Sequence, residues 1–157
     1  ISWADFTSQP SRPHGEVEDA FTKASYRHSY NYARNGNAVT VTDATVDITM
    51  VTPQCWVVTG QATNDLLQHE QGHFDITALA AREFYNTLLN VTALSVRELQ
   101  TKISAAHTKY QQKIDRASIR YDHQTNHSQN TQVQQQWNQQ IAIEKQKPDG
   151  SIDNLPQ

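Results

Sequence analysis

The chain has 157 residues, of which 36% are hydrophobic and 18% are charged, and its formal net charge is −3. This length suits one domain with a buried core, and the charge gives no reason to expect a nucleic acid or an anionic membrane as partner. No segment approaches the about 18 apolar residues of a membrane span, and the single cysteine, Cys55, excludes an internal disulfide. Ile1 in place of an initiator Met suggests a processed chain, for which a removed signal peptide is one explanation.

The first third of the sequence has the two-residue period of β-strands. Aromatic and apolar side chains alternate with polar ones in two runs, Tyr26-His28-Tyr30-Tyr32 and Val46-Ile48-Met50. Asn35-Gly36 between them is a hairpin-turn signal, and Pro53 ends the second run. We expect an antiparallel sheet of three or four strands between about residues 20 and 58.

The remaining sequence predicts three helices. The first starts at the polar cluster Thr63-Asn64-Asp65 and runs to about Asn90, and the second is capped by Thr92 and runs to about Ala117. A polar break spans 121–130, and a Gln-rich third helix then runs from about Thr131 to Lys145. Residues 147–157 have the composition of an exposed tail, so we assign the single domain to residues 1–146.

The most informative motif lies inside the first predicted helix, where residues 69–73 read His-Glu-Gln-Gly-His. Residues four apart share one face of a helix, so His69 and His73 can direct both imidazoles at one tetrahedral zinc ion. Glu70 lies about 100° around the helix from His69, where its carboxylate can activate water and return the proton to a leaving amine. The position of these polar residues among apolar ones argues against a chance match on a solvated helix face.

A third ligand has to come from another segment of the chain. The longer motif HExxHxxGxxH would need a glycine and a histidine where the sequence has Ile76 and Leu79. Glu83 lies about 15 Å along the helix from His73, and Asp75 projects from the opposite face. The polar break instead concentrates candidate side chains, and the residues alone leave the choice among them open. These candidates are Tyr121, Asp122, His123, Thr125 and His127.

Several segments together resemble a bacterial family of domains described as predicted secreted zinc-dependent proteases. The matching segments are ISWADF at the start, the Tyr-rich β segment, QCWVV around Trp56, LLQHEQGHFDITALAAREF, and YDHQTNHSQNTQVQQQW. The likeness covers roughly residues 1–145. It implies His69 and His73 as ligands, Glu70 as the catalytic residue, the segment 121–127 as part of the site, and a secreted or periplasmic location. Because its YDxxTxH pattern ends on His127, we predict His127 as the third ligand, ahead of Asp122 and His123.

We therefore expect an α+β, zincin-like fold and a secreted zinc-dependent metallopeptidase. Zn²⁺ would be held by His69, His73 and His127, Glu70 would activate water, and Tyr121 or His123 would steady the oxyanion. The expected partner is a peptide or protein substrate, without nucleic acid or membrane, and the expected state is a monomer. The alternatives are a zinc-binding or partner-binding domain without catalytic activity, and an amidase that acts on cell-wall crosslinks.

Overall fold

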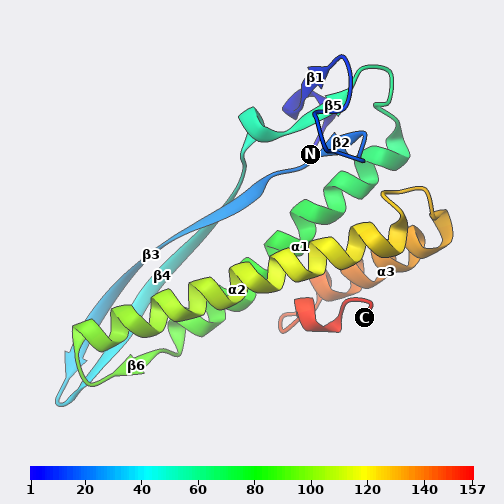
Figure 1. The fold of residues 1–157 in the computed structure, drawn as a ribbon. Coiled ribbons are helices and arrows are strands. Elements are labelled where there is room, and N and C mark those ends of the chain that lie inside the picture. Colours follow the sequence, from blue (N-terminus) through cyan, green and yellow to red (C-terminus); the bar gives the residue numbers. More distant parts are fainter.

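A long β-hairpin lies along a pair of long helices in the computed structural model, which describes residues 1–157 (Figure 1). The hairpin consists of β3 (Ala24–Asn35) and β4 (Ala38–Met50), and the helices are α1 (Asn64–Leu89) and α2 (Val96–Thr125). A third helix, α3 (Thr131–Gln146), packs against both α1 and α2. The expected α+β fold class is therefore confirmed, and no helix is long and apolar enough to pass through a membrane.

The strands form two separate small sheets, so the expected single antiparallel sheet is wrong. In one sheet the order is β3-β4-β6, where β6 is Thr92–Ala93. In the other, β5 (Trp56–Val58) lies between β1 (Thr7–Gln9), which is parallel to it, and β2 (Ala20–Phe21), which is antiparallel. The 3₁₀ turn Thr52–Gln54, with Pro53 in it, ends the hairpin, because proline cannot continue the ladder. The chain after it pairs with the N-terminal segment instead.

The hairpin closes at the predicted Asn-Gly sequence. Asn35 pairs with Ala38, so Gly36 and Asn37 form a two-residue loop, and Gly36 has a φ of +60°. Two-residue hairpin loops need a positive φ, which glycine adopts without a steric cost. The pairing shifts by one residue at a bulge between Asn31 and Tyr32, and beyond it Tyr26 lies in the core beside Phe84 of α1, with ring centroids 5.5 Å apart.

The first helix begins as predicted, since the Thr63 side chain accepts a hydrogen bond from the Leu66 amide at 3.2 Å. The second helix differs from the prediction at both ends. Its N-cap is Ser95, whose hydroxyl accepts from the Glu98 amide, while Thr92 belongs to strand β6. At the other end α2 continues to Thr125, so residues 121–125 form its last turns and are not an irregular break.

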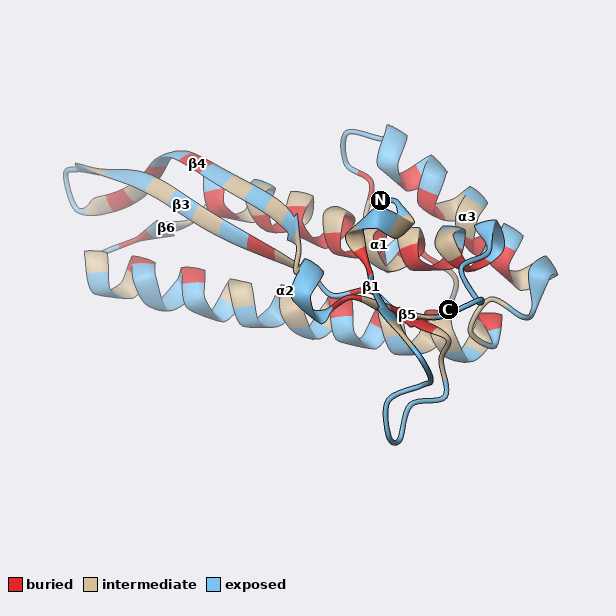
Figure 2. Ribbon diagram, turned by 90° about the horizontal axis from the view of Figure 1, so that it is seen from above, coloured by how far each residue is buried: buried red, intermediate tan, exposed pale blue.

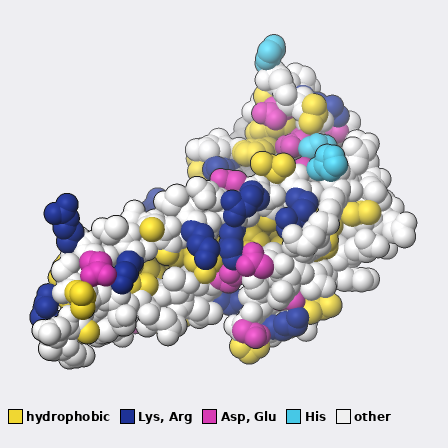
Figure 3. Space-filling model, turned by 60° about the horizontal axis from the view of Figure 1, so that its bottom comes forward, with side chains coloured by type: hydrophobic (Ala, Val, Ile, Leu, Met, Phe, Trp, Pro, Cys, Tyr) yellow, Lys and Arg dark blue, Asp and Glu magenta, His cyan; other side chains and the backbone are white.

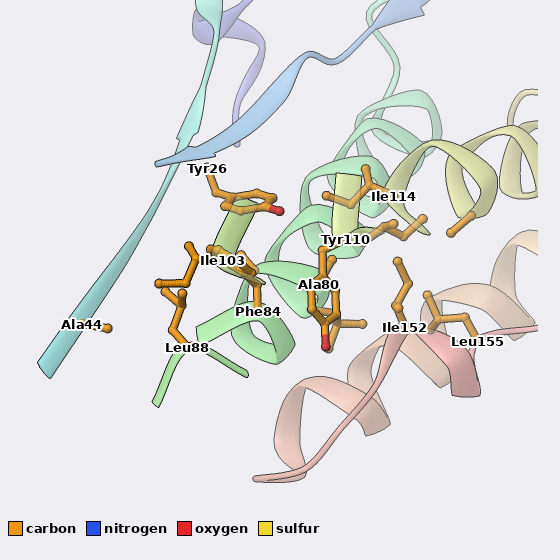
Figure 4. Close-up of a cluster of buried hydrophobic side chains, with 14 of the residues drawn as sticks. Tyr26, Ala44, Ala80, Phe84, Leu88, Ile103, Tyr110, Ile114, Ile152 and Leu155 are labelled. Atoms are coloured by element: carbon orange, nitrogen blue, oxygen red, sulfur yellow. The ribbon is translucent and has the colours of Figure 1, made fainter. Parts of the chain in front are cut away.

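The C-terminal segment is packed into the protein, so the expectation of an exposed tail at 147–157 is wrong. Ile152 and Leu155 are only 2% and 1% exposed, and Figure 4 shows them beside Ile114 of α2. The Arg82 guanidinium on α1 donates to the carbonyl oxygens of Glu144 and Gly150, which fixes the path of the segment. The composition suggested an exposed tail because the two buried apolar residues, Ile152 and Leu155, are separated by polar ones.

Helix α1 is the centre of the fold. It packs against β4, α2 and α3, and Figure 2 shows buried residues along its length while the outer face of α2 is exposed. The main core is a cluster of 21 buried residues that joins the inner face of the hairpin to the three helices. A smaller cluster, formed by Phe6, Ala20, Cys55, Val57 and Leu66, connects the N-terminal sheet to the first turn of α1. The two clusters fix both ends of the helix segment that carries the motif.

Candidate metal centre

Three side chains from two helices converge at the HEQGH motif. His69 and His73 lie one turn apart on α1, with ring centroids 5.0 Å apart. The Nε2 atoms of these residues lie 3.1 Å and 2.8 Å from the same oxygen, Oδ1 of Asp122 on α2. One ligand atom from each residue fits in a group whose members all lie within 4.8 Å of one another. The structure thus brings together His69, His73 and Asp122.

The extension of α2 explains why Asp122 takes this position. The helix keeps its inward face through Ala117, Tyr121 and Thr125, which are all buried. Asp122, one position after Tyr121, therefore lies beside that face and reaches α1. His123, one position further, is exposed and belongs to neither candidate metal group.

His127 lies outside the group of three ligand atoms. It follows the end of α2, and its Nδ1 is 3.3 Å from Oε1 of Glu18. Glu18, Asp122 and His127 form a second group of possible ligands within 4.8 Å. Sequence analysis did not single out Glu18, because no motif surrounds it and it meets His127 only through the tertiary fold.

Glu70 is a buried carboxylate beside the point where the side chains of His69, His73 and Asp122 meet. It is 2% exposed, and its Oε2 atom has no hydrogen-bond partner. Burying an unpaired carboxylate oxygen costs on the order of several kcal/mol, so its retention needs a compensating ligand or function. Together with His73 and Asp122, Glu70 lines a cleft of about 330 Å³.

The cleft opens between the start of the hairpin and the C-terminal half of α2. Phe21 of β2 and Ile119 of α2 both line it, and Glu18 contributes a further carboxylate. Both apolar side chains are partly exposed to solvent, at 37% and 69%. In the face shown in Figure 3, histidine, acidic and hydrophobic side chains gather at one end of the molecule. A ligand in the cleft would contact acidic groups, an imidazole and apolar surface.

A glutamine of α3 contacts Nδ1 of His69, the ring nitrogen that does not face Asp122. This Nδ1 lies 3.0 Å from Oε1 of Gln134, which is 5% exposed, and 3.5 Å from the Thr125 hydroxyl. An Nδ1–H that donates to an oxygen fixes the ring orientation and leaves Nε2 as the ligand atom. Gln134 was missed by sequence analysis because it lies in a helix where glutamine is common, and only its burial distinguishes it.

Tyr121 does not reach the cleft. It is fully buried, its ring stacks on His69 at 4.6 Å between centroids, and its hydroxyl donates to the His69 carbonyl at 3.3 Å. The amide of Gln134 donates to the same hydroxyl. Burial raises the pKa of Tyr121 well above its usual range, so the hydroxyl stays protonated. These contacts hold the His69 backbone and ring, whereas the predicted role was to steady an oxyanion.

The glycine of the motif has a packing role. A Cβ atom at Gly72 would lie 2.6 Å from Cζ and 2.8 Å from Cε1 of Tyr121, closer than side-chain atoms approach in proteins. Only glycine therefore lets α1 and the Tyr121 ring approach closely enough to stack the ring on His69.

The charges of the site depend on one another. Burial raises the pKa of Asp122, but hydrogen bonds from His69 and His73 outweigh it and hold this pKa well below its usual range. For His73, burial lowers the pKa, but the hydrogen bond and charge of Asp122 outweigh it and raise the pKa above its ordinary value. Burial and the nearby Asp122 charge raise the pKa of Glu18 to about 7. The site therefore concentrates negative charge that favours a bound cation.

One protein-family model matches most of the chain. The model of a family described as "Bacterial protein of unknown function (DUF922)" matches residues 4–128. That span contains His69, Glu70, His73 and Asp122, while Gln134 lies beyond it. No curated protein and no solved structure matches the chain. Because the matched span is most of the sequence, the chain belongs to this bacterial family, DUF922.

Proposed function

We propose that the protein is a zinc-dependent metallopeptidase whose metal is held by His69, His73 and Asp122. The observation that carries the proposal is the convergence of both Nε2 atoms on Asp122 Oδ1 next to the unpartnered Glu70 carboxylate. The order of a small sheet, an HExxH helix and further helices supports a zincin-like relation. The resemblance of the motifs supports a location outside the cytoplasm.

The donor atoms fit zinc in number, type and spacing. Two imidazole nitrogens and one carboxylate oxygen leave a fourth position open, as in catalytic zinc sites. Bonds of about 2.0 Å in a tetrahedron separate ligand atoms by about 3.3 Å. The two distances to Asp122 Oδ1, 3.1 Å and 2.8 Å, are close to that spacing. A bound zinc ion would polarise a carbonyl group and lower the pKa of water.

This proposal assigns the third ligand to Asp122, where the sequence predicted His127. His127 pairs with Glu18 and is absent from the group that contains both motif histidines. A carboxylate is an ordinary zinc ligand, and a set of two histidines and one carboxylate is known in catalytic sites.

Glu70 supplies the acid–base chemistry. Its free Oε2 would accept a proton from the water that attacks the peptide carbonyl and would then deliver it to the departing amine nitrogen. Gln134 and Tyr121 keep the His69 ring in position during this cycle through the contacts to Nδ1 and the backbone carbonyl. The cleft supplies apolar contact surface for substrate side chains through Phe21 and Ile119.

The cleft favours a hydrolase over a purely structural zinc site. Structural sites are closed by four protein ligands, whereas here three ligands lie beside a cleft of about 330 Å³. A zinc-binding domain without hydrolytic activity would also have no use for an unpaired buried Glu70 carboxylate.

The test combines metal binding with an unbiased peptide-library digest read by mass spectrometry. We expect the wild-type protein to bind zinc and to cleave peptides, and Glu70→Gln to keep the zinc while losing nearly all turnover. Glu16→Gln, at an exposed glutamate outside both metal groups, is the matched control and should behave as wild type. Zinc binding without cleavage of any peptide would overturn the peptidase and favour the non-catalytic alternative. Cleavage of cell-wall crosslinks alone would favour the amidase.

A further inference from the structure

We infer that Glu18 and His127 form a second metal position with Asp122, so that the Asp122 carboxylate bridges two zinc ions. This inference rests on the proposed function for the first ion, held by His69, His73 and Asp122. Asp122 is the one residue common to both groups of converging ligand atoms. Glu18 and His127 have no role in holding the first ion, and their arrangement still needs an explanation.

Glu18 and His127 lie in contact without a hydrogen bond between them. His127 Nδ1 lies 3.3 Å from Glu18 Oε1, and yet this nitrogen atom is buried and makes no hydrogen bond. A simple ion pair would align the N–H with the oxygen. Two ligand atoms that lie close together without facing each other suit a common cation between them.

The backbone holds His127 in place at an energetic cost. Asn126, His127 and Ser128 have φ angles of +48°, +50° and +75°, and none of them is glycine. One residue in the left-handed region is enough to end a helix, as Asn126 does for α2. Each further non-glycine residue in that region costs on the order of 1–3 kcal/mol, and such strain concentrates at functional sites. The strained turn directs the His127 imidazole back toward Glu18 and Asp122.

The charge of the cleft also exceeds what one ion would balance. Glu18, Glu70 and Asp122 all line it, and no lysine or arginine forms an ion pair with any of the three. The histidines add no compensating charge when they act as metal ligands, because ligand imidazoles are neutral. One divalent cation would leave a charge of −1 on the three carboxylates and two would leave +1, so negative charge that could attract a second cation remains after the first has bound.

Asp122 has the free acceptor that a bridge requires. Both motif imidazoles meet its Oδ1 atom, and the structure shows no hydrogen bond to Oδ2. Carboxylates commonly bridge paired metal ions about 3.5–4 Å apart in hydrolytic enzymes. The second position would offer one imidazole nitrogen and two carboxylate oxygens, a donor set that suits zinc.

The experiment counts zinc ions bound by the full chain after chelator treatment, by titration against a chromophoric competitor. We expect about two ions per chain for the wild type and about one for His127→Ala and Glu18→Gln. His123→Ala and Glu16→Gln remove exposed residues of the same types close by and should keep about two. Circular dichroism and thermal unfolding check that each variant folds, and the nearly isosteric Glu18→Gln decides the outcome if His127→Ala does not fold.

Other zinc counts would contradict the second metal position or the proposed function. One ion in the wild type that is unaffected by Glu18→Gln and His127→Ala would overturn the second position and leave the first intact. Two ions in all of these variants would place the second ion elsewhere and would also overturn the inference. Loss of both ions in folded His127→Ala would assign His127 to the first position. No zinc in the wild type would overturn the proposed function itself.

Discussion

Asp122 Oδ1 lies 2.8 Å from His73 Nε2, although the two residues belong to different helices and are separated by most of α2 in the sequence. The first prediction follows from this contact. Asp122→Ala should weaken zinc binding at the His69–His73 position by more than about 100-fold, because a ligand is lost. His127→Ala should change affinity at that position by less than about tenfold. Chelator competition measures both values, and the reverse order would restore His127 as the third ligand.

The second prediction concerns the support of His69 by α3. Gln134→Ala removes the oxygen that lies 3.0 Å from His69 Nδ1 and should lower zinc affinity by about 10–100-fold. Gln136→Ala, at an exposed position of the same helix, is the matched control and should leave affinity unchanged. Equal affinities for the two variants, both folded, would show that His69 does not depend on Gln134.

A third prediction tests why the motif contains glycine. Gly72→Ala should destabilise the protein by about 1–3 kcal/mol, because its Cβ would overlap the Tyr121 ring. In the double variant Gly72→Ala, Tyr121→Ala the added methyl group meets no ring, so its cost should largely disappear. Denaturant unfolding of the four proteins in this cycle measures the coupling between the two positions. Additive costs would mean that the contact is not the cause.

The fourth prediction concerns the C-terminal segment. Leu155→Ala should lower the free energy of unfolding by about 2–5 kcal/mol, since the side chain is 1% exposed in the core. Leu94→Ala removes the same atoms from a residue that is 73% exposed, and it should change stability by less than about 0.5 kcal/mol. Thermal or urea unfolding compares the two, and similar small losses would show that the segment is not part of the core.

The last prediction is a pH effect away from the metal centre. Hydrogen bonds from Asn154, Lys147 and the Ser151 amide lower the pKa of Glu144 from its ordinary 4.5 to about 2. A lowered folded-state pKa means that the stabilisation is complete above pH 4.5 and is lost as the pH falls toward 2. Glu144→Gln should therefore destabilise the protein at neutral pH and flatten its acid unfolding profile. Glu16→Gln, at an exposed position without an ion pair, should keep the wild-type profile.

Local patterns in the sequence predicted the helices and the hairpin well. The starts of α1 and α3 and the turn at Gly36 follow from capping and turn residues, which act over a few positions. The end of α2 was misplaced because Tyr121 and Thr125 are polar by type, yet both are buried and continue its inward face. Burial of a hydroxyl depends on its partners, and those of the Tyr121 hydroxyl lie on α1 and α3.

The sequence predicted individual site residues only where the site lies on one helix, and for the third ligand it predicted a segment, 121–127, that contains Asp122. His69, Glu70 and His73 are placed by helical geometry alone, and their proximity required no knowledge of the tertiary fold. Asp122 and Glu18 reach the site by the packing of α2 and of the segment before β2, which no local spacing specifies. Gln134 could not be distinguished in the sequence from the other glutamines of α3, most of which face solvent.

The shared contact of both histidines with Asp122 Oδ1 makes protons and metal ions competitors. His73 carries on Nε2, facing this oxygen, the proton that a cation must displace, since Asp122 raises its pKa, whereas the His69 proton lies on Nδ1 toward Gln134. Uptake of zinc should therefore release protons into the medium, and the measured heat of binding should vary with the ionisation enthalpy of the buffer. Acidification should in turn expel the ion while the helices stay in place, because the same oxygen then accepts the returning N–H of His73.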